Sequence, residues 1–374
     1  MQVKAKNMLY DWFVTFRKEG FTEWNSSPYL PIDTLGFGSL YAFAQDPAMR
    51  ELGREGMDFA YYLLAVHSQQ GIFASSSGRT YIKEQFGNWS NCPSGLSWIG
   101  YGYGVPGHAG KGITSYCLSD YEPPKEFAQW FSIPRGKEMI CQTTQGNDGY
   151  VDLYTYKTAD YMMTSANDFH PGEPGHQENP FQLTFNAVAQ LWVTHPGERV
   201  LFGAARPSYW AGNGTLPKVN QYKAFAGLIY DIAPEHPVDF THLYLPSMEF
   251  DRCEVEGKWA FVQLGSAYAA VYCSNGMRMQ DFGSNKDREC IAEGRRCIWL
   301  VRAAQADEFA AFEDFKAAMR GAALDADAEG RRYRFVDPVY GELRCQWGET
   351  LYVNDAPMQY SGFDNYGKLT MQEK

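Results

Sequence analysis

The sequence lacks the features that mark membrane proteins, nucleic-acid-binding proteins and disulfide-rich secreted domains. Its net charge of −11 provides no basic field for a nucleic-acid backbone, although a few local Arg or Lys side chains can still bind an acidic saccharide. Its apolar runs are short and broken, so we expect no membrane span, and its first residues contain no long apolar stretch that would predict a signal peptide. The eight cysteines are scattered without a CxxC pair, which predicts neither a metal knuckle nor a disulfide framework and favours a reducing, cytoplasmic location.

Aromatic residues, in contrast, are abundant, at 16% of 374 residues. Flat rings stack on the apolar faces of sugars, and Tyr and Trp add a polar group at the ring edge. The composition therefore fits a saccharide partner and a β-rich fold equally well, because β-rich proteins are also rich in aromatic residues. The length and the 45% of hydrophobic residues predict two domains, each with a core of its own.

The first part of the chain shows helical periodicity. Residues 3–19 are expected to form an amphipathic helix, and a second helix is expected near 32–44. Asp46 and Pro47 are expected to open a third helix as its N-cap and first helical residue. Helices joined by longer loops favour the stacked hairpins of an α/α toroid over a compact bundle. The apolar face of the first helix is expected to comprise Met8, Leu9, Trp12, Phe13 and Phe16.

The composition changes near residue 136. Residues 71–136 are rich in Gly, Ser, Asn and Pro, which predicts long surface loops with a few short helices. After Gly136, β-branched and aromatic runs predict many antiparallel strands, with a two-residue hairpin turn at Gly265-Ser266 and one helix at about 306–321. We therefore predict an α+β chain, with a helical part over 1–135 that resembles a partial α/α toroid and a large antiparallel β-sandwich over 136–374.

The densest polar cluster lies in SANDFHPGEPGHQENPFQ, where Gly and Pro stiffen the backbone. Histidine transfers protons near neutral pH and a neighbouring carboxylate tunes it, which indicates a catalytic loop, while the alternative is a solvated turn. His and carboxylates alternate here, which leaves a metal ion as an alternative, but no third His lies nearby, so we predict no metal and no other cofactor. The polar residues of this segment are Asn167, Asp168, His170, Glu173, His176, Gln177 and Glu178.

Three further clusters contain candidate site residues. Arg79 offers a planar fork for a carboxylate and Tyr81 a phenol for proton transfer, although an arginine can equally pin a loop to backbone carbonyls. Glu23 lies beside a Trp, an arrangement that can grip a sugar but can equally cap a helix. A fourth cluster, RPSYWAGNG, can stack on a saccharide or form a hairpin with an Asn-Gly turn. The expected substrate-binding residues are Trp24, Asn25, Trp89, Asn167, Glu173, Gln177, Trp210 and Asn213.

Several segments together resemble a known group of proteins. GFTEW, PYLPIDTL, GIFASSSGRTYIKE, YMMTSANDFHPGEPGHQENPFQ and RPSYWAGNGTLPKVNQYK resemble parts of large bacterial and fungal proteins. Those proteins are similar in architecture to the α/α-toroid plus β-sandwich polysaccharide lyases of the heparinase II/III and alginate lyase type. The first resemblance covers most of the chain, and the second concerns architecture, so it implies function by analogy.

This resemblance implies cleavage of a uronic-acid polymer by β-elimination. An Arg, Asn or Gln neutralises the sugar carboxylate, a Tyr or His removes the C5 proton, and a Tyr or His protonates the leaving oxygen. Arg79 and Tyr81 would act from the helical part and His170 or His176 from the β-part, with the two segments facing each other across a cleft. Residues 1–135 are too few for six helical hairpins, so the toroid is expected to be partial.

Three functions follow from these observations. The first is a lyase that acts on a glycan containing uronic acids, with His170, His176, Arg79, Tyr81 and Glu23 as the catalytic set. The second is a glycoside hydrolase, whose two carboxylates would come from Glu23, Asp33, Asp168, Glu173 and Glu178. The third is a saccharide-binding protein without catalysis. The expected partner is a saccharide, with a homo-oligomer left open and with neither nucleic acid nor a membrane.

Overall fold

The computed structural model describes residues 2–86, 91–104 and 111–374, which form two compact units. Unit 1 comprises residues 1–159 and 361–374, so both ends of the chain belong to it, and unit 2 comprises residues 160–360. Helices and strands predominate in different parts of the chain, and every named strand pair in the two units is antiparallel.

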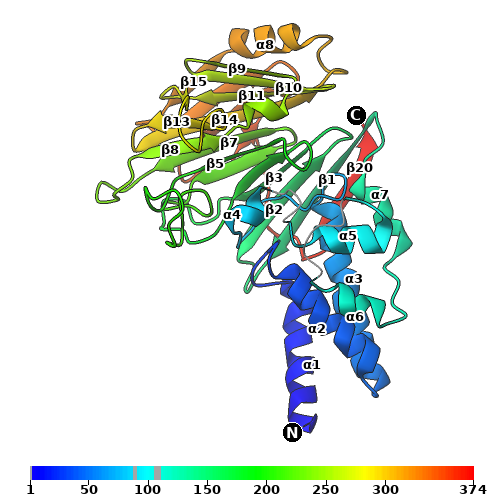
Figure 1. Ribbon diagram of the computed structural model, residues 1–374. Helices are drawn as coiled ribbons and strands as arrows, with labels where there is room; N and C mark the ends of the chain where they lie inside the picture. The colour runs from blue at the N-terminus through cyan, green and yellow to red at the C-terminus, as the bar shows by residue number, and fades with distance from the viewer. Residues whose placement is uncertain (1, 87–90, 105–110) are drawn as a thin grey trace. The chain divides into compact units, whose positions relative to one another are not determined.

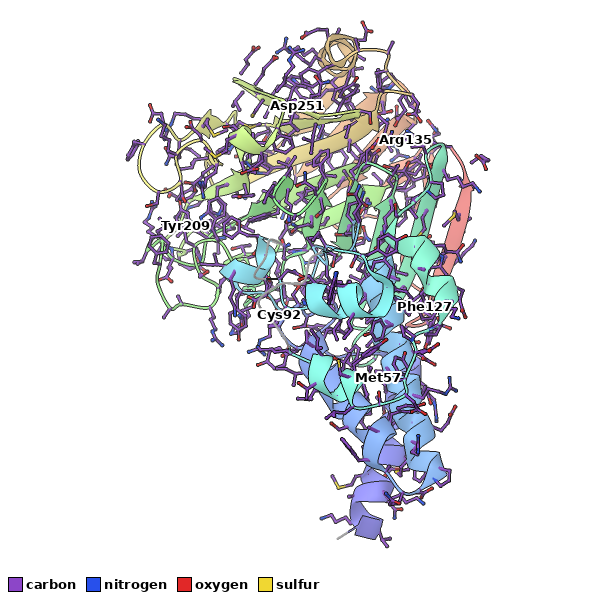
Figure 2. All side chains as sticks on the ribbon, turned by 45° about the vertical axis from the view of Figure 1, so that its right-hand side comes forward. Met57, Cys92, Phe127, Arg135, Tyr209 and Asp251 are labelled. Carbon is purple, nitrogen blue, oxygen red and sulfur yellow. The ribbon has the colours of Figure 1, made fainter. Side chains whose placement is uncertain are left out.

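Three longer helices begin unit 1 and lie side by side, namely α1 (Gln2–Glu19), α2 (Leu30–Phe43) and α3 (Pro47–Val66) (Figure 1). The Asp46 side chain accepts a hydrogen bond from the Ala48 backbone N at 2.9 Å, which confirms the predicted N-cap of α3. Aromatic rings fill the space between the helices, and Met57 is fully buried among them (Figure 2). The rings in mutual contact are Phe13, Phe16, Phe21, Phe37 and Phe59.

Short helices and three strands complete unit 1. The short helices are α4 (Ile82–Gln85), α5 (Ser94–Tyr101), α6 (Ile113–Cys117), the 3₁₀ helix η1 (Lys125–Phe127) and α7 (Ala128–Phe131). The strands are β1 (Lys137–Gln145), β2 (Val151–Lys157) and β20 (Lys368–Glu373). Strand β1 pairs with β2 on one side and with β20 on the other, so the last residues of the chain are part of the same sheet as residues 137–157.

Two antiparallel sheets of unit 2 face each other. The first has the order β12-β13-β8-β5-β4-β3 within this unit and the second the order β6-β7-β14-β11-β10-β9. The Trp299 indole of the second sheet donates to the Thr241 hydroxyl of the first at 2.8 Å, and the Tyr230 hydroxyl donates to the Val193 carbonyl at 3.2 Å. These contacts cross the buried space between the sheets, as in a β-sandwich. The strands are β3 (Met162–Asn167), β4 (Phe181–Thr184), β5 (Gln190–Thr194), β6 (Lys218–Tyr222), β7 (Phe225–Asp231), β8 (Phe240–Tyr244), β9 (Arg252–Glu256), β10 (Trp259–Leu264), β11 (Ala267–Cys273), β12 (Arg278–Met279), β13 (Glu289–Glu293) and β14 (Arg296–Gln305).

A third sheet and a helix cover the outer face of the second sheet. The third sheet consists of β15 (Leu324–Asp327), β16 (Arg332–Asp337), β17 (Gly341–Gln346), β18 (Tyr352–Val353) and β19 (Ala356–Pro357). Its Phe335 ring stacks on Phe225 of β7 with the ring centroids 5.7 Å apart. Helix α8 (Phe312–Gly321) places Phe315 on Tyr268 of β11 at 5.7 Å. Unit 2 is therefore thicker than a simple two-sheet sandwich.

The predicted fold class is wrong in its helical part, because the described residues contain no α/α toroid. A toroid needs a ring of long, paired helices, whereas α4 to α7 are only four to eight residues long. The Gly and Pro residues of 71–136 interrupt helices, and periodicity over α1 to α3 alone does not determine how many further helices follow. Met8 and Trp12, which we expected in the buried face of α1, are exposed, while Phe13 and Phe16 are buried.

Two local predictions in unit 2, a hairpin turn and a helix, can be compared with the structure. Strands β10 and β11 pair with Leu264 opposite Ala267, which confirms the hairpin turn at Gly265-Ser266. The helix expected at about 306–321 begins only at Phe312, after a turn.

Candidate functional site

Two of the sequence clusters come together in unit 1, although they are about 50 residues apart in the chain. The Gly78 backbone N donates to the Trp24 carbonyl at 2.8 Å, and the Asn25 amide donates to the Ser76 carbonyl at 3.3 Å. A side chain at Gly78 would collide with the Trp24 indole, because a Cβ there would lie 2.6 Å from its Nε1. Glycine therefore permits the close approach of the two segments 23–26 and 76–79.

An ion pair joins the two segments. The Arg79 guanidinium donates to Oε1 of Glu23, and it also lies over the Tyr29 ring, 5.0 Å from the ring centroid. The Glu23 side chain is 39% exposed and that of Arg79 is 24% exposed, so the pair is accessible from solvent. Because the Glu23 carboxylate already neutralises the Arg79 guanidinium, Arg79 is not a free cation for a substrate carboxylate.

Asp33 lies in the first turn of α2 and has a raised pKa. Burial, together with the nearby negative charge of Glu23, raises the pKa of Asp33 to about 7. The N-terminal dipole of α2 acts in the opposite direction, but it is worth about 0.3–1 kcal/mol, less than the roughly 1.4 kcal/mol that changes a pKa by one. Asp33 is therefore partly protonated at neutral pH, while Glu23 is held beside a cation.

The neighbouring predicted residues of unit 1 differ in exposure. Asn25 is buried and has a positive φ of 46°, a conformation that asparagine tolerates better than most residues. The Trp24 ring is buried in full, so it packs inside the unit and does not offer an open platform to a sugar. Tyr81 is half-buried directly before α4. Trp89 lies outside the described residues.

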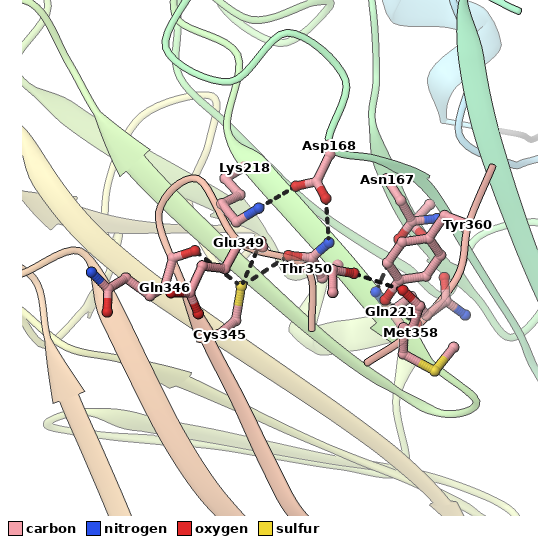
Figure 3. A network of polar contacts seen from close by, with 12 residues as sticks. Asn167, Asp168, Lys218, Gln221, Cys345, Gln346, Glu349, Thr350, Met358 and Tyr360 are labelled. Carbon is pink, nitrogen blue, oxygen red and sulfur yellow. Dashed lines mark hydrogen bonds and ion pairs between the residues drawn. The ribbon is translucent and has the colours of Figure 1, made fainter. Parts of the chain in front are cut away.

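In unit 2, the beginning of the predicted histidine loop is tied down by hydrogen bonds. The Asp168 carboxylate accepts from the Lys218 ammonium and from the Asn220 amide (Figure 3). Lys218 is only 3% exposed, so Asp168 neutralises a buried cation. The Asn167 side chain accepts from the backbone N of Gln221 at 3.0 Å. These contacts give Asn167 and Asp168 a role in holding β6 to the loop.

The rest of that loop is more open. His170 has a positive φ of 46°, and its Nδ1 lies 3.5 Å from a carboxylate oxygen of Glu173. His176 is exposed and Gln177 is buried. Both histidines are therefore placed in unit 2, whereas Arg79 and Tyr81 belong to unit 1. The expected cleft between the segment of Arg79 and Tyr81 and the segment of the two histidines stays a prediction.

The fourth cluster lies in the core of unit 2. The Asn213 side chain is fully buried; it donates to the Glu178 carbonyl at 3.0 Å and accepts from the His195 backbone N at 3.0 Å. It therefore joins the loop at 206–216 to the histidine loop. The Trp210 ring is stacked on the His242 imidazole, with the ring centroids 4.1 Å apart, so its face is already occupied.

A buried network beside Trp210 was not predicted from the sequence. The Nδ1 atom of His242 lies 2.7 Å from Oε1 of Glu289, to which the Tyr209 hydroxyl also donates at 2.6 Å. The Asn285 amide donates to the other oxygen of Glu289 at 2.8 Å. Burial is the main cause that lowers the pKa of His242. These residues are distant in sequence, and no motif connects them.

The described residues show neither a metal cluster nor a membrane-spanning helix. Over residues 2–86, 91–104 and 111–374, no group of three or more His, Cys, Asp or Glu side chains is arranged to hold a metal ion. In the same residues, every helix is too short or too polar to cross a bilayer. Comparison with protein family models, curated proteins and solved structures found no match to this chain.

Proposed function

We propose that the protein is a carbohydrate-active enzyme that hydrolyses a glycosidic bond with Asp33 and Glu23. The observation that supports this proposal is the pair of different carboxyl environments in unit 1. Burial raises the pKa of Asp33 to about 7, whereas Glu23 forms an ion pair with Arg79. Two carboxyl groups whose environments separate their protonation states are typical of glycoside hydrolysis.

The chemistry assigns one role to each carboxyl group. Asp33, in its protonated form, donates its proton to the oxygen of the leaving sugar as the glycosidic bond breaks. Glu23, beside the Arg79 guanidinium, either attacks the anomeric carbon or removes a proton from the attacking water. Water supplies the hydroxyl group of the new reducing end. Its other proton passes to Asp33 when Glu23 is the nucleophile; when Glu23 is the base, the proton passes to Glu23 and Asp33 regains its own from solvent.

Elimination by a lyase is the second candidate. Arg79 and the half-buried Tyr81 are two residues apart, which suits neutralisation of a sugar carboxylate and abstraction of the C5 proton, with His170 or His176 as the other proton-transfer group. It ranks second because the Arg79 guanidinium is already bound to Glu23 and would have to exchange partners.

The reducing, cytoplasmic location inferred from the scattered cysteines stays a prediction.

A comparison of products tests these functions. We would incubate the protein with neutral and acidic polysaccharides and measure both reducing ends and the ultraviolet absorbance of unsaturated sugars. Reducing ends without that absorbance support hydrolysis, and the absorbance supports elimination. If neither product forms, the protein is a saccharide-binding protein or has another function.

Substitution of Asp33 is the sharper test. We expect Asp33→Asn to lower kcat by about 10²–10⁴-fold, because the amide cannot donate a proton to the leaving oxygen. The wild-type rate should fall as the pH rises through about 7, where Asp33 loses its proton. Asp11→Asn, on the exposed surface of α1, is the matched control and should leave the rate unchanged. Wild-type activity in Asp33→Asn would rule out this role.

A further inference from the structure

The two paired segments of unit 1 contain buried polar atoms that form no hydrogen bond with any described residue. Among the described residues, no partner exists for Oε2 of Glu23, Oδ1 of Asn25, Oγ of Ser77 or Nε of Arg79. Buried polar atoms in folded proteins are nearly always paired, so four such atoms in two adjoining segments need an explanation. A bound ligand that forms hydrogen bonds with these four atoms would explain why the protein leaves them unpaired.

The segments hold these atoms in a defined arrangement. The Asn25 amide is anchored by its bond to the Ser76 carbonyl, and the Ser26 hydroxyl donates to the Arg79 carbonyl at 3.4 Å. Asn25 and Ser77 are 1% and 3% exposed and lie deepest, while the Glu23–Arg79 pair is partly open to solvent. Of the four side chains, those of Glu23 and Arg79 are therefore the ones that a ligand would contact first.

The chemistry of the four atoms selects the ligand. The Glu23 and Asn25 oxygens only accept hydrogen bonds, Nε of Arg79 only donates, and the Ser77 hydroxyl does both. Sugar hydroxyl groups each donate and accept, so adjacent hydroxyls on one ring can satisfy this mixed set. A carboxylate only accepts and would bring a negative charge next to Glu23, whose own charge already offsets that of Arg79.

We infer that Glu23, Asn25, Ser77 and Arg79 form a subsite that binds adjacent hydroxyl groups of a neutral pyranose, in preference to a uronic acid. This inference rests on the proposed glycoside hydrolase function and names the sugar class at its site. Glu23 keeps its catalytic role, and Asn25 and Ser77 determine specificity.

Direct binding measurements test the subsite apart from turnover. We would titrate the full chain with trisaccharides of glucose, mannose, galactose and xylose, and with trisaccharides of glucuronic and galacturonic acid, by isothermal calorimetry. At least one neutral trisaccharide should bind at least tenfold more tightly than every acidic one. Ser77→Ala and Asn25→Gly should each weaken that binding by tenfold or more, and glycine is chosen at position 25 because it adopts the positive φ without strain.

Ser75→Ala is the matched control. The Ser75 hydroxyl is also buried in this run of serines but has a partner, the Ser76 carbonyl at 3.1 Å, so its removal should leave the dissociation constant unchanged. Melting curves would establish that all variants fold. Neutral-sugar binding that depends on Asn25 and Ser77 but yields no reducing ends would uphold the subsite and refute the hydrolase. Tighter binding of the acidic sugars, equal binding by all variants, or no binding would overturn the subsite.

Discussion

At the scale of single residues, the environment of each carboxyl group decides its chemistry. Glu23 and Asp33 are ten positions apart, and nothing in their residue type distinguishes a proton donor from a stable anion. Arg79 lies beside Glu23, whereas burial and the charge of Glu23 raise the pKa of Asp33 to about 7. The difference therefore comes from partners that the fold provides.

This difference predicts how stability depends on pH. The folded state binds the Asp33 proton more tightly than the unfolded state, whose pKa is near 3.8, so the stabilisation is complete below about pH 4 and is lost as the pH rises through about 7. Asp33→Asn keeps a neutral group at every pH. Its free energy of unfolding relative to wild type should therefore rise by roughly 2–4 kcal/mol across this window, measured by urea unfolding at several pH values. A difference that stays constant with pH would contradict the prediction.

At the scale of elements, the C-terminus of α3 is held by a buried lysine of β2. The Lys157 ammonium donates to the Ala65, Ser68 and Trp130 carbonyls, and so binds the helix end where a positive charge is favoured. Burial lowers the pKa of Lys157 to about 7, whereas hydrogen bonds to three carbonyl acceptors stabilise the charged ammonium. These contacts connect α3, α7 and the sheet of unit 1.

We expect Lys157→Met to lower the free energy of unfolding by about 2–4 kcal/mol, because three carbonyls lose their donor in a buried place. Urea unfolding would measure the loss, and hydrogen exchange should accelerate first at the end of α3. Lys125→Met, at an exposed position in η1, is the control and should change little. An unchanged unfolding midpoint for Lys157→Met would show that the ammonium does not stabilise the helix end.

At the scale of the whole molecule, the end of the chain returns to the unit that contains its beginning. Strand β20 pairs with β1, the Asn365 amide donates to the Phe16 carbonyl at 3.2 Å, and the Tyr62 hydroxyl donates to the Tyr366 carbonyl. Residues 361–374 therefore connect the sheet of unit 1 with its helices.

Deletion of residues 361–374 should destabilise unit 1 more than unit 2, since it exposes one edge of β1 and removes the partners of Phe16 and Tyr62. Hydrogen exchange followed by mass spectrometry would show faster exchange in α1, α3 and β1, with the strands of unit 2 nearly unchanged. Equal acceleration throughout both units would mean that the chain unfolds as one cooperative body and would refute the prediction.

Features that depend on neighbouring residues could be predicted from the sequence. Asp46 caps α3 through a bond to a residue two positions away, and Gly265-Ser266 forms the turn between strands that pair directly across it. Such contacts need little chain closure, so local pattern predicts them well. The polar segments around Glu23, Arg79 and His170 were also visible as clusters, because stiff turn-forming residues surround them.

Which clusters meet, and how far the helical part extends, depend on contacts between residues that are distant in the chain. Glu23 and Arg79 are 56 residues apart, and their contact depends on the close approach that Gly78 allows beside Trp24. The toroid failed as a prediction because helical periodicity describes single helices and carries no information on how many pack together. Burial, likewise, is a property of the whole core. Trp24 and Trp210 are buried, and burial raises the pKa of Asp33. The type of these residues does not predict either outcome.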